Sequence, residues 1–145
     1  MDTLTAMQIS ASGLKAERAR LNIAAMNLAN ANTTRTMEGG PYRAKSVVFE
    51  AKPLEGVNFR DTLNSTTERL RQVEVVQVVE DQAPFKDVYD PTHPDADANG
   101  IVHFPNVNVA EQMVDMMGAR RGYEANVTAL DAAKSMALKA LDIGR

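Results

Sequence analysis

The two ends of the chain carry one repeating apolar pattern, and it restricts the possible folds more than any other feature. In the first 32 residues, apolar side chains recur in alternating steps of three and four, which is a heptad repeat. Seven of the eight positions are apolar, and the exception, Arg18, would set the register or face a partner. The positions are Leu4, Met7, Ala11, Leu14, Arg18, Leu21, Ala25 and Leu28.

The last 37 residues repeat the arrangement at Val109, Met113, Met116, Arg120, Tyr123, Val127, Leu130, Lys134, Ala137 and Leu141. At about 1.5 Å per residue, the two helices would be roughly 40 Å and 50 Å long. Each stripe is too narrow for a globular core, and a helix draws most of its stability from packing such a face. We therefore expect the termini to pair as a coiled-coil-like hairpin, with the strand-rich middle at one end.

Residues at the helix ends predict where each helix starts and stops. Thr5 and Gln8 have capping-box spacing, although a start at Asp2 fits equally well. Asn108 and Glu111 have the same spacing before the last helix, and Gly144 lies where a C-cap is expected. Three glycines inside the helices are each costly there, so we expect them to permit close packing: Gly13, Gly118 and Gly122.

The middle of the chain has the texture of strands and turns. Residues 73–80 carry valine on both faces, which predicts burial on both sides or pairing with another chain. Further strands are predicted at residues 43–51 and 101–104, and a mobile loop at residues 55–69. The fold class is therefore α+β. It divides into an N-terminal helix (1–35), a β-rich middle domain (36–108) and a C-terminal helix (109–145).

Composition excludes several classes of function. The 145 residues include 16 basic and 19 acidic ones, a net charge of −3, so no basic footprint for nucleic acid exists. No cysteine is available for a disulfide, a thiolate metal site or a nucleophile, and no glycine-rich phosphate loop predicts a cofactor. The first residues lack the regions of a secretory signal peptide, and no apolar run is long enough to span a membrane.

One loop resembles part of a metal site. Residues 95–100 (DADANG) match the first half of a calcium loop, but the twelfth position, which should be glutamate, is Asn106. A turn-rich loop is the competing interpretation, and a small calcium-binding module stays an alternative function. His93 and His103 have no helical spacing typical of metal ligands, and nothing indicates catalysis. Arg120 and Glu124 have the spacing of an i,i+4 ion pair.

Several blocks in order resemble the bacterial flagellar basal-body rod protein family, and its proximal rod members in particular. They are SASGLKAER (10–18), NLANANT (27–33), GGPYR (39–43), YDPTHPDADANG (89–100), PNVN (105–108) and ARRGYEANV (119–127). Ile101 departs from the tyrosine expected there. The signature residues are Gly13, Leu14, Asn27, Ala29, Asn30, Thr33, Gly40, Pro41, Tyr42, Asp90, Pro91, Pro94, Asn99, Gly100, Pro105, Asn106, Tyr123 and Asn126.

The resemblance implies a structural subunit, not an enzyme, with no cofactor, metal or small-molecule substrate. It implies a place in the periplasmic rod, the shaft that carries torque from the rotor ring to the hook. The implied partners are further copies, other rod proteins, the rotor (MS) ring with its adaptor, and the flagellar type III export apparatus. The assembly interface would be Leu4, Met7, Ala11, Leu14, Arg18, Leu21, Ala25, Leu28, Met113, Met116, Arg120, Tyr123, Val127, Leu130 and Leu141. Another axial protein of the rod and hook families is a second alternative.

Overall fold

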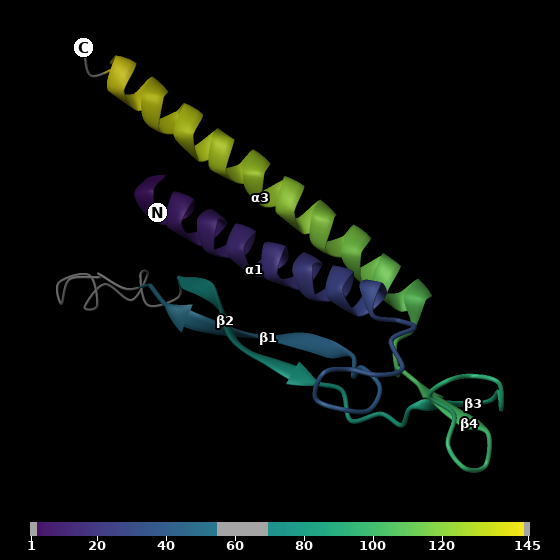
Figure 1. Ribbon diagram of the computed structural model, residues 1–145. Coiled ribbons are helices and arrows are strands. Elements are labelled where there is room, and N and C mark those ends of the chain that lie inside the picture. Colours follow the sequence, from purple (N-terminus) through teal and green to yellow (C-terminus); the bar gives the residue numbers. More distant parts are fainter. Residues whose placement is uncertain (1–2, 55–69, 144–145) are drawn as a thin grey trace.

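The computed structural model describes residues 3–54 and 70–143, which form two long helices and two small antiparallel sheets (Figure 1). Helix α1 spans Thr3–Ala29 and helix α3 spans Val109–Ile143. Strands β1 (Lys45–Pro53) and β2 (Arg71–Glu80) form one sheet, and β3 (Lys86–Tyr89) pairs with β4 (Ile101–Phe104) in the other. The α+β fold and the helical hairpin predicted from the sequence are confirmed.

Small residues bring the two helices together as an antiparallel pair. Ala16 and Ala24 of α1 and Ala119 and Ala133 of α3 are buried, while the larger apolar side chains nearby are not. Small side chains let two backbones approach closely, and the contact then covers little apolar area per residue. The predicted heptad stripes are therefore not the seam between the helices, and the expectation that they pair the two termini is wrong.

The β1–β2 hairpin lies along α1, on a different side from α3 (Figure 1). Its register pairs Lys45 with Glu80 and Pro53 with Arg71, with an irregularity between Val48 and Phe49. The backbone N–H of Val73 donates to Ser12 Oγ of α1 at 3.2 Å, which fixes the far end of the hairpin to the helix. The expectation that the whole middle lies at one end is therefore wrong, since only β3 and β4 project beyond the helices (Figure 1).

Burial on both faces of β2, one of two predicted outcomes, is also wrong for this chain. Val73, Val76 and Val78 are exposed, because this sheet has two strands within residues 3–54 and 70–143 and α1 covers it in part. Pairing with another chain stays a prediction. Strand β3 was missed, because its four residues are short, partly charged and bounded by prolines at 84 and 91.

Of the two predicted helix ends that the described residues test, one is confirmed and one is wrong. Asn108 Oδ1 accepts from Ala110 N at 3.2 Å, so Asn108 caps α3 as predicted. The start at Thr5 is wrong, because Thr3 already lies in α1. The alternative start at Asp2, the cap at Gly144 and the loop at residues 55–69 fall outside the described residues.

Candidate assembly surface and the joint that supports it

Asn27 ties three parts of the chain together at the end of α1. Its side chain is 1% exposed and makes four hydrogen bonds. Nδ2 donates to the Lys45 carbonyl at 2.7 Å and to Gln112 Oε1 at 2.9 Å. Oδ1 accepts from Tyr42 Oη and from the Lys45 backbone N–H, both at 2.9 Å. One amide thereby joins α1, the start of β1 and the first turn of α3 with every bonding position used.

A small core surrounds this joint. It consists of Tyr42, Ala44 and Val107, with Ala31 packed against it. Asn106 supports the core from the chain that enters α3: its Oδ1 accepts from Ala44 N at 2.9 Å, and its Nδ2 donates to two carbonyls beyond β2. Burial and the nearby carboxylate of Glu80 raise the pKa of Tyr42 above its usual value.

Two glycines in the helical seam face polar side chains of the opposite helix. A Cβ atom on Gly13 would lie 2.7 Å from Asn126 Oδ1, and a Cβ on Gly122 would lie 2.8 Å from Glu17 Cδ. The close packing predicted for these two glycines is confirmed. It is wrong for Gly118, whose Cβ would meet nothing within 4 Å among the described residues. An ion pair of 2.7 Å between Arg20 and Asp115 adds to the seam.

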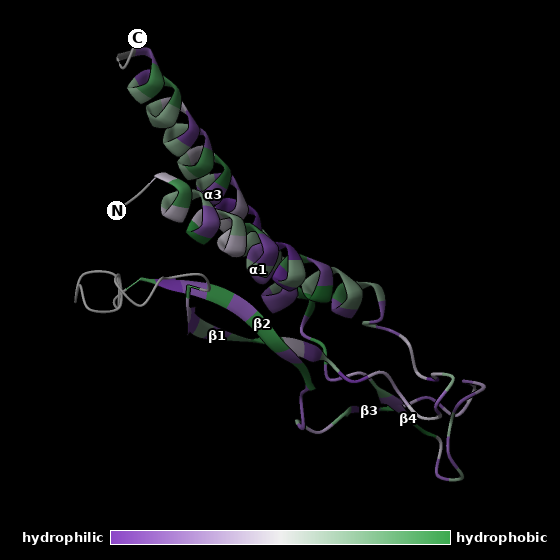
Figure 2. Cartoon of the chain, turned by 90° about the vertical axis from the view of Figure 1, so that its left-hand side faces the viewer, coloured by the Kyte–Doolittle hydropathy of each residue, from purple (hydrophilic) through white to green (hydrophobic). Residues whose placement is uncertain are grey.

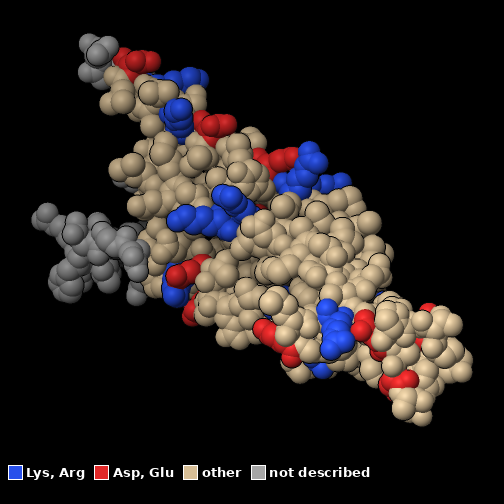
Figure 3. Space-filling model, in the orientation of Figure 1, with Lys and Arg blue, Asp and Glu red and all other residues tan. Residues whose placement is uncertain are grey.

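The predicted interface residues lie beside the seam and are only partly covered. None of the fifteen is buried, and Leu4, Arg18, Met113, Arg120, Tyr123 and Leu141 are exposed. Apolar and polar residues alternate along the visible surface of both helices (Figure 2), and charges of both signs are separated by uncharged surface (Figure 3). The chain therefore leaves its larger apolar helix residues available to another molecule.

Four of the predicted residues meet across the two helices in an open groove of about 400 Å³. We call this the Glu17 groove; it is lined by Glu17, Arg18, Leu21, Asn22, Arg120, Tyr123 and Glu124. The predicted ion pair is present at its edge, where Arg120 Nε lies 3.0 Å from Glu124 Oε1. The Glu17 atom Oε2 is shielded from solvent and accepts no hydrogen bond from the described residues.

The DADANG segment folds as a turn around Asp97. Asp97 Oδ1 accepts from the backbone N–H groups of Asn99 and Ile101 at 2.8 and 2.9 Å, and Gly100 has φ of 76°. These bonds, led by that from Ile101, hold the pKa of Asp97 below its usual range. The hydroxyl of Thr92 does the same for the pKa of Asp90. Within residues 3–54 and 70–143, no three His, Asp or Glu side chains are grouped as metal ligands would be.

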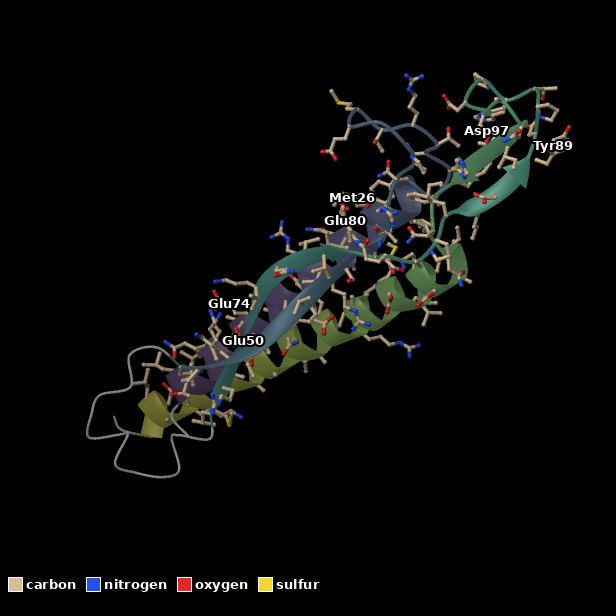
Figure 4. All side chains as sticks on the ribbon, turned by 90° about the horizontal axis from the view of Figure 1, so that it is seen from below. Met26, Glu50, Glu74, Glu80, Tyr89 and Asp97 are labelled. Atoms are coloured by element: carbon tan, nitrogen blue, oxygen red, sulfur yellow. The ribbon has the colours of Figure 1, made fainter. Side chains whose placement is uncertain are left out.

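The two histidines contact residues of β3 and β4, at the end of the molecule where Tyr89 and Asp97 lie (Figure 4). His93 Nδ1 accepts from the Asp95 backbone N–H at 3.1 Å, and its ring meets Phe104 edge-on. His103 Nδ1 lies 2.5 Å from Asp87 Oδ1. Both rings are thus engaged locally.

Most signature residues shape the joint and turns instead of lining the groove. Asn27, Tyr42 and Asn106 form the joint, Gly13 and Asn126 meet in the seam, and Pro105 is buried. Asn30 and Thr33 bond each other, Gly40 has φ of 76°, and Asp90, Asn99 and Gly100 belong to the β3–β4 turn. Leu14 and Pro41 are half-buried, and exposed members are Ala29, Pro91, Pro94 and Tyr123.

Sequence reasoning missed Ser12, Glu17, Arg20 and Gln112 as contact residues. Their side chains are polar, so a search for apolar periodicity does not find them. The i,i+4 spacing of Ser12 and Arg20 to Ala16, and of Arg20 to Ala24, would have been the signal that places them near the buried alanines.

Comparison with known proteins decides the family. Residues 7–35 match the family described as "Flagella basal body rod protein", and residues 98–143 match "Flagellar basal body rod FlgEFG protein C-terminal". The "Flagellar basal-body rod protein FlgC" of Salmonella typhimurium is 44% identical over 145 residues, all of both chains. That of Bacillus subtilis is 42% identical over 153 residues, again all of both chains. That of Borreliella burgdorferi is 38% identical, covering 99% of this chain and 98% of its own. The chain belongs to the FlgC family of flagellar basal-body rod proteins.

Membership of the FlgC family makes the chain a structural protein of the flagellar basal body, not an enzyme. It confirms the resemblance that the sequence blocks indicated. No helix within the described part of the chain is long and apolar enough to cross a membrane.

Proposed function

We propose that this FlgC-family chain is a subunit of the proximal rod, the periplasmic shaft that transmits torque from the rotor ring to the hook. The terminal segments, residues 1–35 and 109–145, contain α1 and α3 and act as the assembly part, and residues 36–108 form a β-rich part outside it. The partners are further copies, other rod proteins, and the rotor (MS) ring with its adaptor. The chain reaches the rod through the flagellar type III export apparatus.

One observation carries the proposal: the helical hairpin closes with small residues and leaves the predicted stripes uncovered. Ala16, Ala24, Ala119 and Ala133 fill the seam, whereas Leu4 is 66% and Leu141 70% exposed. Large apolar side chains left exposed or half-exposed along both helices of a rod-family member are best explained as contacts between subunits.

Coupled ordering and binding follows from the same arrangement. An isolated chain covers α1 with α3 and the hairpin, but the apolar ends of the helices near Leu4 and Leu141 remain open to water. We propose that the helices complete their ordering on incorporation, when neighbouring subunits bury the stripes and offset the entropy cost.

The test replaces a stripe residue with a charge. Leu21→Asp and Leu130→Asp should each abolish rod assembly and swimming, because a carboxylate cannot be buried without a partner. Val48→Asp is the matched control, since Val48 is 43% exposed on the hairpin and away from the stripes. Electron microscopy of basal bodies should show rings without a completed rod for the first two variants and complete structures for the control. Normal swimming of both stripe variants would refute the proposed assembly role of the stripes.

A further inference from the structure

The turn between β3 and β4 holds the one Asn-Gly pair of the sequence, Asn99-Gly100. Asn99 is exposed. Gly100 has a φ of 76°, in the left-handed region that favours glycine. A Cβ atom there would also lie 3.0 Å from Tyr89 Cε2 and 3.1 Å from Pro91 Cβ. The turn therefore requires a residue without a side chain directly after Asn99.

An asparagine followed by glycine is chemically labile, because no side chain obstructs the backbone nitrogen that follows the amide. The backbone nitrogen of Gly100, once its proton has passed to a hydroxide ion, can attack Cγ of the Asn99 side chain. The new N–Cγ bond closes a succinimide ring, and the Cγ–Nδ2 bond breaks as Nδ2 takes up a proton and leaves as ammonia. Water then opens the ring at either carbonyl, which yields aspartate or isoaspartate.

In the folded turn, Asp97 holds the groups that would react. The Gly100 N–H donates to the Asp97 carbonyl at 3.0 Å, and the Gly100 carbonyl accepts from the Asp90 N–H at 2.9 Å. Asp97 Oδ1 accepts from the Asn99 N–H at 2.8 Å, and the Asn99 side chain interacts with the same carboxylate. Attack on Cγ requires the Gly100 nitrogen to leave the Asp97 carbonyl, so the turn must first open.

We propose that Asn99 is a site of spontaneous deamidation and that the turn held by Asp97 sets its rate. In the unfolded chain, the Gly100 nitrogen is free to attack. In the folded chain, only the fraction of molecules whose turn is open reacts, so the reaction is several-fold slower. The inference is independent of the proposed rod function, because it concerns the chain alone with water.

Deamidation would change the end of the small sheet next to the turn. Either product adds a negative charge beside Asp97. Isoaspartate also adds a methylene group to the main chain, which shifts the Gly100 carbonyl relative to the Asp90 N–H. The paired residues Tyr89 and Ile101 follow directly in the register. We expect β3 and β4 to pair less stably in the product, because a turn of altered length no longer fixes their register.

Mass spectrometry of the purified chain tests the proposal. The chain is incubated in mildly alkaline buffer, either folded or denatured in guanidinium chloride, and is then digested at acidic pH, where deamidation is slow. Each deamidated asparagine is located by the small mass increase of its fragment ions. Asn106 and Asn108 are internal controls, because each is followed by valine, whose β-branched side chain obstructs the next nitrogen.

Two comparisons decide the outcome. In the denatured chain, Asn99 should deamidate many times faster than Asn106 or Asn108. In the folded chain, Asn99 should react several-fold more slowly than in the denatured one. A denatured chain in which Asn99 reacts no faster than the two control asparagines would overturn the labile site. Equal rates at Asn99 in the folded and denatured chains would overturn its control by the turn.

Asp97→Ala and Asp95→Ala form a matched pair of variants. Each removes one carboxylate from the same segment, but the Asp97 carboxylate bonds the N–H groups of Asn99 and Ile101, whereas that of Asp95 accepts from Thr34 Oγ1 at 2.7 Å. We expect Asp97→Ala to raise the folded rate several-fold and Asp95→Ala to leave it unchanged, with circular dichroism showing that both keep their helices. Equal rates for the two variants would overturn the role of Asp97. The comparison of the folded and denatured natural chain needs neither variant.

Hydrogen–deuterium exchange follows the consequence for the sheet. The amide groups of residues 86–89 and 101–104 should exchange faster in the aged chain that contains isoaspartate than in the fresh chain. Asn99→Gln, whose longer side chain cyclises far more slowly, should show no such change on ageing. Unchanged exchange in a chain that has deamidated at Asn99 would overturn the effect on the sheet.

Discussion

Removing the Asn27 amide should destabilise the purified chain more than any other single polar truncation in α1. Asn27→Ala deletes four hydrogen bonds of a side chain that is 1% exposed, and it removes the Asn27 partner of the Lys45 N–H and carbonyl. A hydrogen bond contributes about 1 kcal/mol net, and an unsatisfied buried group adds to the cost, so the loss should be about 3–5 kcal/mol. Against a total stability of about 5–15 kcal/mol, this is a large fraction.

The matched control is Asn30→Ala, one turn further along the chain. Asn30 also bonds through both ends of its amide, to the Met26 carbonyl and Thr33 Oγ1, but it is only half-buried. Water can replace those partners, so the cost should stay near 1 kcal/mol. Asn27→Asp tests the hydrogen bonds separately from the shape of the side chain, which it leaves almost unchanged. It keeps an acceptor for Tyr42 and the Lys45 N–H, but offers no donor at neutral pH to the Lys45 carbonyl or Gln112.

The measurement is urea unfolding followed by circular dichroism, with the tyrosine signal reporting on the joint through Tyr42. The midpoint of Asn27→Ala should fall well below that of the control, and its melting temperature by roughly 10–15 °C for a chain of this size. Asn27→Asp should be destabilised at neutral pH despite its nearly identical shape. If Asn27→Ala costs no more than Asn30→Ala, the joint does not depend on this amide and the reasoning fails.

Two further predictions concern the seam and the joint. Gly13→Ala should destabilise the chain even though alanine favours helices, because the new Cβ would meet the Asn126 amide. That amide is held by its 2.9 Å hydrogen bond to the Gly122 carbonyl. Gly122→Ala should destabilise the chain less, because the Glu17 side chain that it meets is flexible. Thermal unfolding of both variants compares them, and a more stable Gly13→Ala would contradict the geometry. Tyr42 should titrate above the usual range of a tyrosine in a spectrophotometric titration, because burial and the Glu80 carboxylate raise its pKa. Because the folded chain then holds this proton more tightly than the unfolded one, Tyr42 should lower stability as the pH rises from about 10 through its folded pKa. Titration of Tyr42 at the ordinary pKa of a tyrosine would argue against a buried phenol.

The fold class was predictable because helices and strands carry different periods. Apolar steps of three and four identified both helices, and the β-branched run at residues 73–80 identified β2. Strand β3 carries no such pattern in its four residues and is defined by pairing with β4, for example Val88 with Val102. A partner distant in sequence specified that strand, so local reasoning could not find it.

The helical seam was misread for a physical reason. A stripe of large apolar residues was expected to be the contact within the chain, but alanines and glycines form that contact and the large residues lie outside it. Hydrophobic periodicity indicates that a helix face will be covered, and does not say by which molecule. The role of Asn27 could not be predicted from the sequence either. Its four hydrogen bonds go to groups from different parts of the chain, and only the folded structure brings these together.

This division of residues between the seam and the stripes is what the proposed rod subunit would require. A chain that buried its large apolar residues internally would be more stable as an isolated molecule. It would then have little apolar surface left to bury against neighbouring subunits. Small residues in the seam fix the register of the helices, because Asn126 packs over Gly13 and Glu17 packs over Gly122. These contacts bury little apolar area. Under the proposed function, the larger stripe residues are buried further when the subunit assembles. On this view, larger apolar residues in the seam between α1 and α3 would make the isolated chain more stable but a poorer subunit. The small apolar area buried between the two helices is then part of how the chain assembles.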